Sequence, residues 1–398
     1  MKVFSMLKDL GGLLLIVKDQ RYLKKFYQET KKIPLDPPSA VSSVEQNGER
    51  SVCFVIHRLV DYGGGNASIL KLGTALVSLG WSVKYVTIQP GVDEVDFQNY
   101  GQQLVPTVKG RFCRLSALHA RLGVATSWHT AYFVKENRAH FDFCGYFIQD
   151  FEPGFSPISH LFWMGMETYR MGLINFSLGA WNANTILKFD PTVELEALTF
   201  PVDLTMYPTV KRTLRVCDEP LRVLVYMKRS FRRGSALVWR QLVELKRVFG
   251  DRVQIDVFGL FPLAFPLPFG RHLGKLKPAQ LNELYTHYHV GVVSSFSNVS
   301  LVPFEMLSRG LPVIDYRAGS ASAFFAENEI LLADLSLSGL VNIFQDIFSG
   351  KVDLNDVVSC GQANMSGRSW LDVATEFEAL MQKRAVCSKA PRAMPSAM

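Results

Sequence analysis

Residues 51–88 follow the order strand, glycine loop, helix, strand, and this order restricts the chain to few folds. An uninterrupted apolar run at 52–56 precedes three consecutive glycines at 63–65. Apolar side chains at helical spacing then extend from 69 to 79, and a second strand is predicted at 81–88, after Gly80. Short apolar runs are typical of strands buried on both faces, and a helix between two of them predicts a parallel α/β sheet.

A second series of the same kind begins after Pro220. Beyond residue 88 we expect strands at 123–127, 144–148, 173–177, 221–226, 254–259, 289–293 and 312–315, and helices at 236–249, 281–288 and 302–309. Two series of about 150 residues each predict two doubly wound, Rossmann-like domains facing a cleft, an α/β architecture. A last helix is predicted after Ser369, which forms a capping pattern with Asp372 three residues on.

Changes in composition divide the chain into five segments. Prolines, serines and an Asn-Gly pair between 34 and 50 are typical of a linker. We therefore expect a basic N-terminal arm with its linker at 1–50, a first Rossmann-like domain at 51–215, a second at 216–365, a C-terminal helix at 366–383 and a flexible tail at 384–398.

The positive charge is concentrated at the two ends of the chain. The net charge is +7, residues 1–33 carry +5 and residues 383–398 carry +4, so the body between them carries −2. A nucleic-acid binder needs a basic face on its fold, so we expect no nucleic-acid partner. Basic ends suit an anionic membrane surface, or they are simply solvated. Because residues 1–33 mix lysines with apolar residues, they fit a membrane-interface helix and a packing arm equally well.

Cysteine usage and the N-terminal segment indicate a reducing compartment. The six cysteines are scattered, without a CxxC pair or metal-ligand spacing. The apolar stretch at 10–17 is too short to cross a membrane, and Lys18-Asp19-Gln20-Arg21 follows it in place of a signal-peptide cleavage site. We expect a cytoplasmic protein, in peripheral contact with the inner face of the cell membrane if its basic ends bind lipid.

The loop at 63–66 is the first of three strand-to-helix loops that suggest ligand binding. Glycines there let a phosphate or sugar approach the backbone amides, although a tight turn explains them as well. The run reads Gly-Gly-Gly-Asn, and the second strand ends Thr87-Ile88-Gln89 without an acid. A dinucleotide fingerprint requires GxGxxG with such an acid, which argues against an NAD enzyme.

The second loop, at 225–234, collects cationic side chains after the first strand of the second series. It contains Lys228, Arg229, Arg232 and Arg233. Ligands of open α/β sheets bind beyond the carboxyl ends of the strands. Cations at that place would neutralise the charge that develops on a departing diphosphate. A solvated basic loop is the alternative interpretation.

The third segment, 294–314, has a polar loop, a short helix with one acid, and a further strand. Amides near Ser300 and Leu301 would face a phosphate. Glu305 would accept hydrogen bonds from ribose hydroxyls, since a lone carboxylate among apolar neighbours is costly unless it has partners.

With these segments in order, residues 51–382 resemble the GT-B glycosyltransferases of retaining family 4. The matching positions are Gly63–Gly65, Lys228 with Arg233-Gly234, Leu273-Gly274 before the helix at 281–285, Glu305 with Gly310-Leu311-Pro312-Val313-Ile314, Phe200-Pro201-Val202-Asp203 near the domain linker, and the Trp370 helix, which in the family crosses back to the first domain. Residues 126–131 and 145–154 are most similar to the rhamnan-synthesis and S-layer rhamnosyltransferase branch, which uses dTDP-rhamnose.

The resemblance implies a retaining, metal-independent hexosyltransferase that needs no cofactor. It would transfer a sugar, with rhamnose as the subfamily expectation, from a dTDP-, GDP- or UDP-sugar to a growing glycan or lipid-linked glycan in cell-surface polysaccharide synthesis. The expected catalytic residues are Lys228, Arg233 and Glu305, and the expected donor-binding residues are Ser297, Asn298, Ser300, Leu301 and Glu305. The first domain would contact the acceptor and the sugar through Gly64, Gly65, Asn66, His129, Gln149, Asp150 and Glu152.

Two positions depart from the family pattern. Ser297 stands eight residues before Glu305, where the family has a glutamate that faces the donor sugar. Gln149 replaces the histidine usual after the fourth strand, and His57 and Asp61 on the first loop are further candidates for substrate contact. These departures leave open a non-catalytic GT-B subunit of a polysaccharide assembly complex and a GT-B sugar-nucleotide epimerase.

Overall fold

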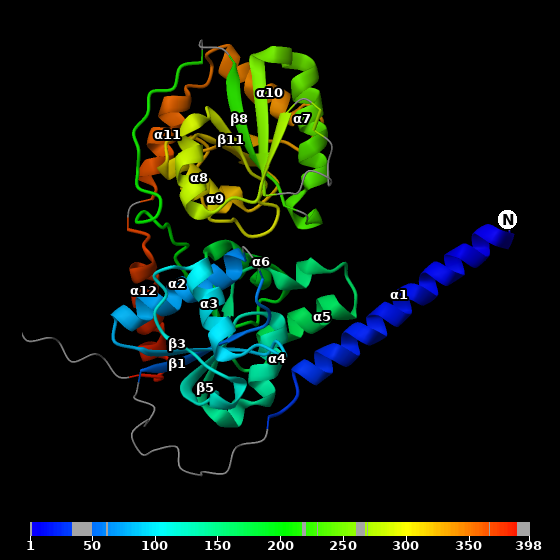
Figure 1. Cartoon of the computed structure of the whole chain (residues 1–398), viewed down its shortest axis with the longest axis vertical. Helices are drawn as coiled ribbons and strands as arrows, with labels where there is room; N and C mark the ends of the chain where they lie inside the picture. The colour runs from blue at the N-terminus through cyan, green and yellow to red at the C-terminus, as the bar shows by residue number, and fades with distance from the viewer. Residues whose placement is uncertain are drawn as a thin grey trace, which may run out of the picture. The chain divides into compact units, whose positions relative to one another are not determined.

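The computed structural model describes residues 2–33, 50–60, 63–216, 220–228, 230–259, 267–268, 270–365 and 367–387, with the side chains of 2–15 and of residue 231 left aside. Residues 34–49 of the linker expected at 34–50, Asp61, Arg229 and the tail beyond 387 lie outside these residues. The chain forms two compact units (Figure 1). Unit 1 comprises Met1–Ser177, Thr192–Glu196 and Ala374–Met398, and unit 2 comprises Leu178–Pro191 and Ala197–Val373.

The first sheet has seven strands in the order β3-β2-β1-β4-β5-β6-β7. Its strands are β1 (Ser51–Ile56), β2 (Ser82–Thr87), β3 (Arg111–Phe112), β4 (Ala120–Ala125), β5 (Phe141–Ile148), β6 (Ile174–Leu178) and β7 (Leu195–Leu198). Neighbouring strands from β3 to β6 pair in parallel, and all six residues of β1 are buried. The strand order reverses between β1 and β4, which makes their carboxyl ends the switch point of this sheet.

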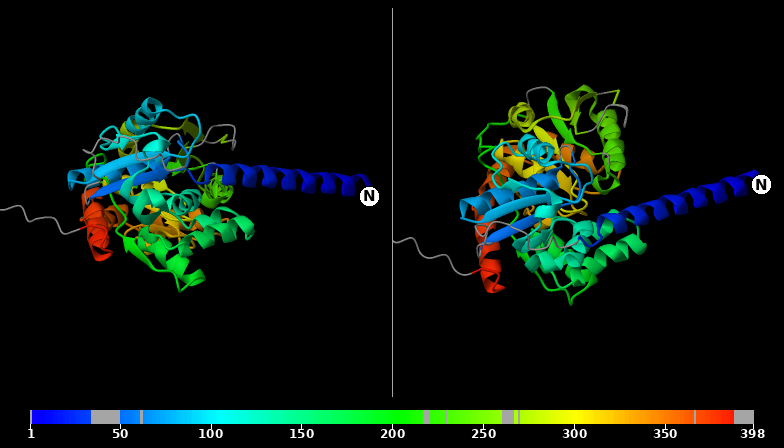
Figure 2. Two further views of the ribbon diagram at one scale, coloured as in Figure 1. Left: turned by 90° about the horizontal axis from the view of Figure 1, so that it is seen from below. Right: turned by 60° about the horizontal axis from the view of Figure 1, so that its bottom comes forward.

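Helix α1 (Lys2–Glu29) precedes the first strand. The helices between the strands are α2 (Gly64–Ser78), α3 (Glu94–Leu104), α4 (Trp128–Glu136), α5 (His160–Glu167) and α6 (Ala180–Phe189). Two further views show α1, in dark blue, as one continuous helix (Figure 2). No helix in the described part of the chain is long and apolar enough to cross a membrane.

The second sheet is parallel throughout, with the order β10-β9-β8-β11-β12-β13. Its strands are β8 (Leu221–Tyr226), β9 (Val253–Phe258), β10 (Gly270–Gly274), β11 (Val290–Val292), β12 (Val313–Tyr316) and β13 (Leu331–Ala333). Here the order reverses between β8 and β11, so the loops that follow these two strands lie side by side. This sheet therefore has a switch point of its own.

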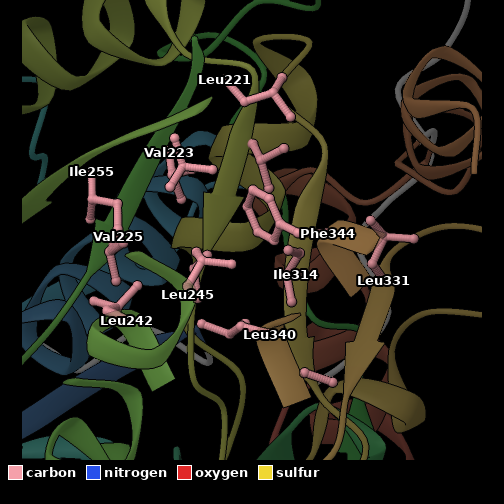
Figure 3. Close-up of a cluster of buried hydrophobic side chains, with 14 of the residues drawn as sticks. Leu221, Val223, Val225, Leu242, Leu245, Ile255, Ile314, Leu331, Leu340 and Phe344 are labelled. Atoms are coloured by element: carbon pink, nitrogen blue, oxygen red, sulfur yellow. The ribbon is translucent and has the colours of Figure 1, made fainter. Parts of the chain in front are cut away.

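Helices and strands of unit 2 enclose an apolar core. The helices are α7 (Ser235–Phe249), α8 (Pro278–Leu284), α9 (Val302–Ser308), α10 (Gly339–Phe348), α11 (Leu354–Ala363) and α12 (Trp370–Lys383), whose residues from Ala374 on belong to unit 1. Val223 and Val225 of β8 point into this core with Leu242 and Leu245 of α7 and Phe344 of α10 (Figure 3). This core holds β8 in the middle of the sheet and so fixes where its following loop begins.

The doubly wound α/β architecture predicted from the sequence is confirmed. The prediction did not include α3, α4, α5, α6, α10 and α11, nor the edge strands β3, β7, β10 and β13. Leu273 and Gly274, expected in a loop, end β10, and α8 stops at Leu284 with a 3-10 turn after it. Edge strands such as β10, with Arg271 and His272, are half-exposed and lack the continuous apolar run that identifies a central strand.

The N-terminal cap of α12 contributes measurably to stability. Ser369 Oγ accepts a hydrogen bond from Asp372 N at 3.2 Å, and Asp372 Oδ2 accepts one from Ser369 N at 2.7 Å. We expect Ser369→Ala to lower the free energy of unfolding by about 1 kcal/mol in a denaturant titration. Ser349→Ala is the control, because that hydroxyl only donates to Asp346 O and caps no helix N-terminus. Equal losses in both variants would contradict this role of Ser369.

Candidate active site

Arg233 lies at the switch point of the second sheet and ties two loops together. It closes the 3-10 turn Phe231–Arg233 after β8, and its Nη1 donates to Ser294 O, after β11, at 3.4 Å. Ser294 Oγ donates in return to Arg233 O. A guanidinium has five N–H donors, so this bond leaves most of them for an anion. The position beyond β8 and β11 is where open parallel sheets bind ligands.

Gly234 and Lys228 define the shape of the same loop. Gly234 has a left-handed φ of +56°, and a Cβ there would lie 2.3 Å from the Phe296 ring, so only glycine fits. Ser235 Oγ donates to Lys228 O at 2.5 Å, which joins the start of the loop to the start of α7. Lys228 Nζ is 5.8 Å from the centre of the Tyr226 ring. Lys228 and Arg233 therefore stand at opposite ends of one short, constrained loop.

A buried carboxylate that the sequence prediction missed fixes the loop after β11. Asp315, in β12, accepts hydrogen bonds at Oδ1 from Ser295 N at 2.9 Å and from Tyr316 N at 2.8 Å. Burial raises the pKa of Asp315, while its hydrogen bonds to Ser295 and the positive charge of Arg233 oppose that rise. Asp315 thus connects the backbone of the second loop to the charge of the first. The available signal was an acid inside an otherwise apolar strand.

Glu305, in the first turn of α9, lines a small pocket in unit 2. The pocket is formed by Val202, Asp203, Tyr207, Leu301, Phe304 and Glu305. Tyr285 Oη donates to Glu305 Oε2 at 3.1 Å. Burial, followed by the charge of Glu305, raises the pKa of both Tyr285 and Tyr207, so both phenols remain protonated donors. Two phenols, those of Tyr285 and Tyr207, therefore face the Glu305 carboxylate in this pocket.

The remaining donor-side residues lie in the loop before α9. Ser297 is 9% exposed and Asn298 is 2% exposed. The Asn298 amide donates to Leu178 O at 3.2 Å and accepts from Val299 N at 3.1 Å, so it shapes this loop. Ser300 is half-buried, and Leu301 lines the pocket beside Glu305. The structure thus brings Leu301 and Glu305 together in one pocket. The side chain of Asn298 stabilises the loop through its hydrogen bonds.

In unit 1, Gln149 and Glu152 converge on the loop after β4. Glu152 is buried, and its Oε2 accepts a hydrogen bond from Trp128 N, at the N-terminus of α4, at 2.6 Å. A carboxylate in this position is stabilised by the helix dipole. Gln149 Nε2 donates to Thr126 O at 3.5 Å, and Asp150 Oδ1 accepts from Phe151 N at 2.9 Å. These bonds position the loop that presents His129.

The glycine loop opens α2 close to Gln149. A Cβ at Gly65 would lie 3.4 Å from Gln149 Oε1, whereas a Cβ at Gly64 would meet no protein atom within 4 Å. Asn66 Nδ2 donates to Arg58 O and to Tyr100 Oη, both at 2.7 Å. Asn66 therefore holds the loop, and the space beside Gly64 is not filled by the described part of this chain.

His129 lies beneath α1 at the switch point of the first sheet. Its Nε2 forms a 2.6 Å hydrogen bond with Tyr22 Oη, and its ring stacks on His57 with 4.0 Å between centroids. Burial, with help from the charge of Arg58, lowers the pKa of His129 to about 2 and that of His57 to about 4. Both imidazoles are therefore neutral at pH 7. The sequence prediction missed Tyr22 as the partner of His129, because 107 residues separate them.

Comparison with known proteins identifies the architecture as the GT-B glycosyltransferase fold. Sucrose-phosphate synthase from Thermosynechococcus elongatus superposes with a TM-score of 0.67 at 16% identity, over 84% of this chain and 99% of that one. HepE from Anabaena, solved with UDP and glucose, gives a TM-score of 0.65 at 13% identity, over 84% of this chain and 100% of that one. The two Rossmann-like sheets are those of this fold class.

Sequence comparison gives one curated relative from polysaccharide biosynthesis. The O-antigen biosynthesis protein RfbC of Myxococcus xanthus is 28% identical over 240 residues, which is 57% of this chain. The matched stretch spans 18% of the length of RfbC. No model of a known protein family matches the chain.

Proposed function

We propose that this protein is a glycosyltransferase that transfers a sugar from a nucleotide diphosphosugar to a growing glycan in cell-surface polysaccharide synthesis. The observation that carries the proposal is the constrained loop with Lys228 and Arg233 at the switch point of a parallel sheet. Two relatives support it: HepE was solved with UDP-glucose, and RfbC is a protein of O-antigen biosynthesis.

In the proposed mechanism, Lys228 and Arg233 hold the diphosphate of the donor. Their positive charge stabilises the negative charge that develops on this group as the bond to the sugar breaks. The departing phosphate takes the proton of the acceptor hydroxyl on the same face of the sugar, which gives retention without a metal ion. Because the loop is already fixed by Ser294 and Ser235, little reorganisation is needed during the reaction.

Glu305 would bind the ribose of the donor nucleotide. Its carboxylate is held by Tyr285, and Leu301 and Phe304 form the apolar side of the same pocket. Ribose hydroxyls are hydrogen-bond donors, and a carboxylate is an acceptor for them. The amides near Ser300 would contact the phosphates.

Unit 1 would bind the acceptor at the carboxyl ends of β1 and β4. Gly64 is exposed and leaves the backbone at the start of α2 open to a sugar, and Gln149 lies close to the same loop. The acceptor would be a glycan or a lipid-linked glycan, and we place the protein in the cytoplasm, with its basic ends at the inner membrane face.

The donor base and sugar follow from the branch resemblance and from Ser297. We propose dTDP-rhamnose as the donor, since residues 126–131 and 145–154 resemble the rhamnosyltransferase branch. A serine in place of the family glutamate removes a charged contact to the donor sugar. A deoxysugar, which has fewer hydroxyl groups, is compatible with that loss.

The test is a thermal-shift panel of UDP-, GDP- and dTDP-sugars. We expect one nucleotide to stabilise the wild type, and Glu305→Ala to weaken its binding by about 10–100-fold because the ribose loses a charged acceptor. Glu283→Ala is the matched control, since Glu283 is exposed on α8 and only 4.0 Å from His287. A panel without any shift would contradict the donor site, and an equal loss in both variants would contradict the role of Glu305.

Ser297 also supports a second candidate, a non-catalytic GT-B subunit. Such a subunit would bind a nucleotide sugar without turnover, whereas a transferase releases the nucleoside diphosphate only when an acceptor is present. An epimerase would instead convert the nucleotide sugar with no acceptor at all. Following the nucleotide by chromatography, with and without glycan, separates these three outcomes.

A further inference from the structure

The C-terminal part of α1 covers the switch point of the first sheet. His57 and Arg58 follow β1, and Trp128 and His129 follow β4, and all four contact α1. The contacts are Tyr22 Oη with His129 Nε2 at 2.6 Å, the Phe26 ring stacked on Trp128 at 5.2 Å, and Glu29 with Arg58 and His57. In open parallel sheets this is the place of the ligand. In this structure, part of the chain itself fills it.

The Glu29 carboxylate places a negative charge beside Arg58 and His57, as an anionic ligand bound at this switch point would. Its side chain is 8% exposed, Arg58 Nη2 donates to its Oε1, and His57 Nε2 lies 3.6 Å from its Oε2. Lys25 Nζ, on the same helix, is 3.9 Å from Oε1. Burying a carboxylate against a guanidinium costs the hydration of both ions. An arm needed only for packing would be held as well by apolar contacts such as that of Phe26.

The segment that follows α1 is anchored separately. Ile33 N donates to Asn137 Oδ1 at 2.7 Å, and Asn137 Nδ2 donates to Lys31 O at 3.2 Å. Asn137 is fully buried at the end of α4. Release of α1 from His57 and Arg58 therefore does not require release of residues 31–33, which leaves the helix a pivot at its C-terminal end.

We propose that α1 closes an anion-binding acceptor site, and that Glu29 occupies the position of the anionic group of the acceptor. When α1 moves away, Arg58, His57 and His129 are exposed to a phosphate or a carboxylate. An acceptor that carries its sugar on a diphosphate would supply the first, and an acidic glycan the second. The assignment of this site to the acceptor rests on the proposed transferase function, whereas the closure itself rests only on the contacts of α1.

The test measures binding of inorganic pyrophosphate and of D-glucuronate to the full-length protein by calorimetry. It uses the Arg233→Ala background, so that the proposed donor loop does not contribute. We expect Glu29→Gln to raise the affinity for at least one anion about tenfold, since the competing carboxylate is lost, and added Arg58→Gln to abolish the gain. A response to pyrophosphate alone identifies a phosphate-bearing acceptor, and a response to glucuronate alone an acidic glycan.

Two further variants separate the closure by α1 from a general loss of stability. Phe26→Ala, which loosens α1 but leaves Glu29 in place, should also raise anion affinity, and both variants should increase hydrogen exchange of residues 19–30. Glu94→Gln is the matched control, because Glu94 pairs with Arg114 elsewhere in unit 1. A lower melting temperature of Glu29→Gln without a gain in affinity, or a gain that survives Arg58→Gln, would overturn the closure. Neither result depends on the nucleotide panel, so the two proposals can fail separately.

Discussion

We expect Arg233→Ala to lower turnover about 10²–10³-fold, while the free energy of unfolding changes by less than about 1 kcal/mol. The large effect on rate follows from the position of the guanidinium beyond β8 and β11, where the proposed diphosphate leaves. The small effect on stability follows from its contacts, since its described side-chain bond is to Ser294 O at 3.4 Å. Initial rates with saturating donor, beside a denaturant titration, measure both quantities.

Two variants control this result. Arg233→Lys keeps the charge but loses the fork of donors, so it should recover only part of the turnover. Arg247→Ala removes an arginine of α7 that pairs with Glu244 on the same helix, and it should leave the rate unchanged. Wild-type turnover in Arg233→Ala would remove Arg233 from the mechanism, and an equal loss in Arg247→Ala would show that the effect is not specific to the loop.

The second large effect is acid destabilisation through His57 and His129. Their folded-state pKa values, lowered to about 4 and about 2, lie below the ordinary 6.5. The unfolded chain therefore binds more protons than the folded one, and stability is full above pH 6.5 and is lost as the pH falls. The loss is about 1.4 kcal/mol per pH unit for each histidine, ending near pH 4 for His57 and near pH 2 for His129.

The groups that face the two rings set the size of this effect. Tyr22, Lys25 and Glu29 approach from α1 and Arg58 from the loop after β1, while the rings themselves stack at 4.0 Å. Arg58 and Lys25 disfavour a proton on His57, and Glu29 favours it, with burial the largest cause. Protonation of both rings would place two positive charges in direct contact beneath α1, so the packing of α1 on the two rings weakens as the pH falls.

Denaturant titrations at pH 7, 6 and 5 measure this prediction. The free energy of unfolding of the double variant His57→Gln, His129→Gln should fall less steeply with falling pH than that of the wild type. Between pH 6 and pH 5 the two slopes should differ by the binding of about two protons. His287→Gln is the control, because His287 is exposed and 4.0 Å from Glu283. Identical slopes in the wild type and the double variant would contradict the burial of neutral histidines under α1.

Much of the fold was predictable because its central strands are buried on both faces. Strand β8 has the predicted bounds, 221–226, since apolar residues fill it except at Arg222, which is exposed. Helix α10 could have been predicted, because Leu340, Phe344 and Ile347 follow helical spacing. The edge strand β10 could not, because its residues are polar and only its pairing with β9 makes it a strand.

The candidate site also contains residues that the sequence predicts and residues that it does not. Lys228, Arg233 and Glu305 belong to short local patterns and could be named from the sequence. Their partners could not, since Asp315 and Tyr285 reach the site through the sheet order and the packing of neighbouring turns. The cover that α1 places on His129 depends on a contact over 107 residues, which no local pattern encodes.

Hydrogen exchange of the full-length protein with and without the preferred nucleoside diphosphate is a direct test of the donor site. We expect the nucleotide to protect residues 227–235 and 294–305, and Arg233→Ala to weaken this protection at the same nucleotide concentration. Protection confined to other segments, or none at a concentration that produces a thermal shift, would contradict the donor site proposed here.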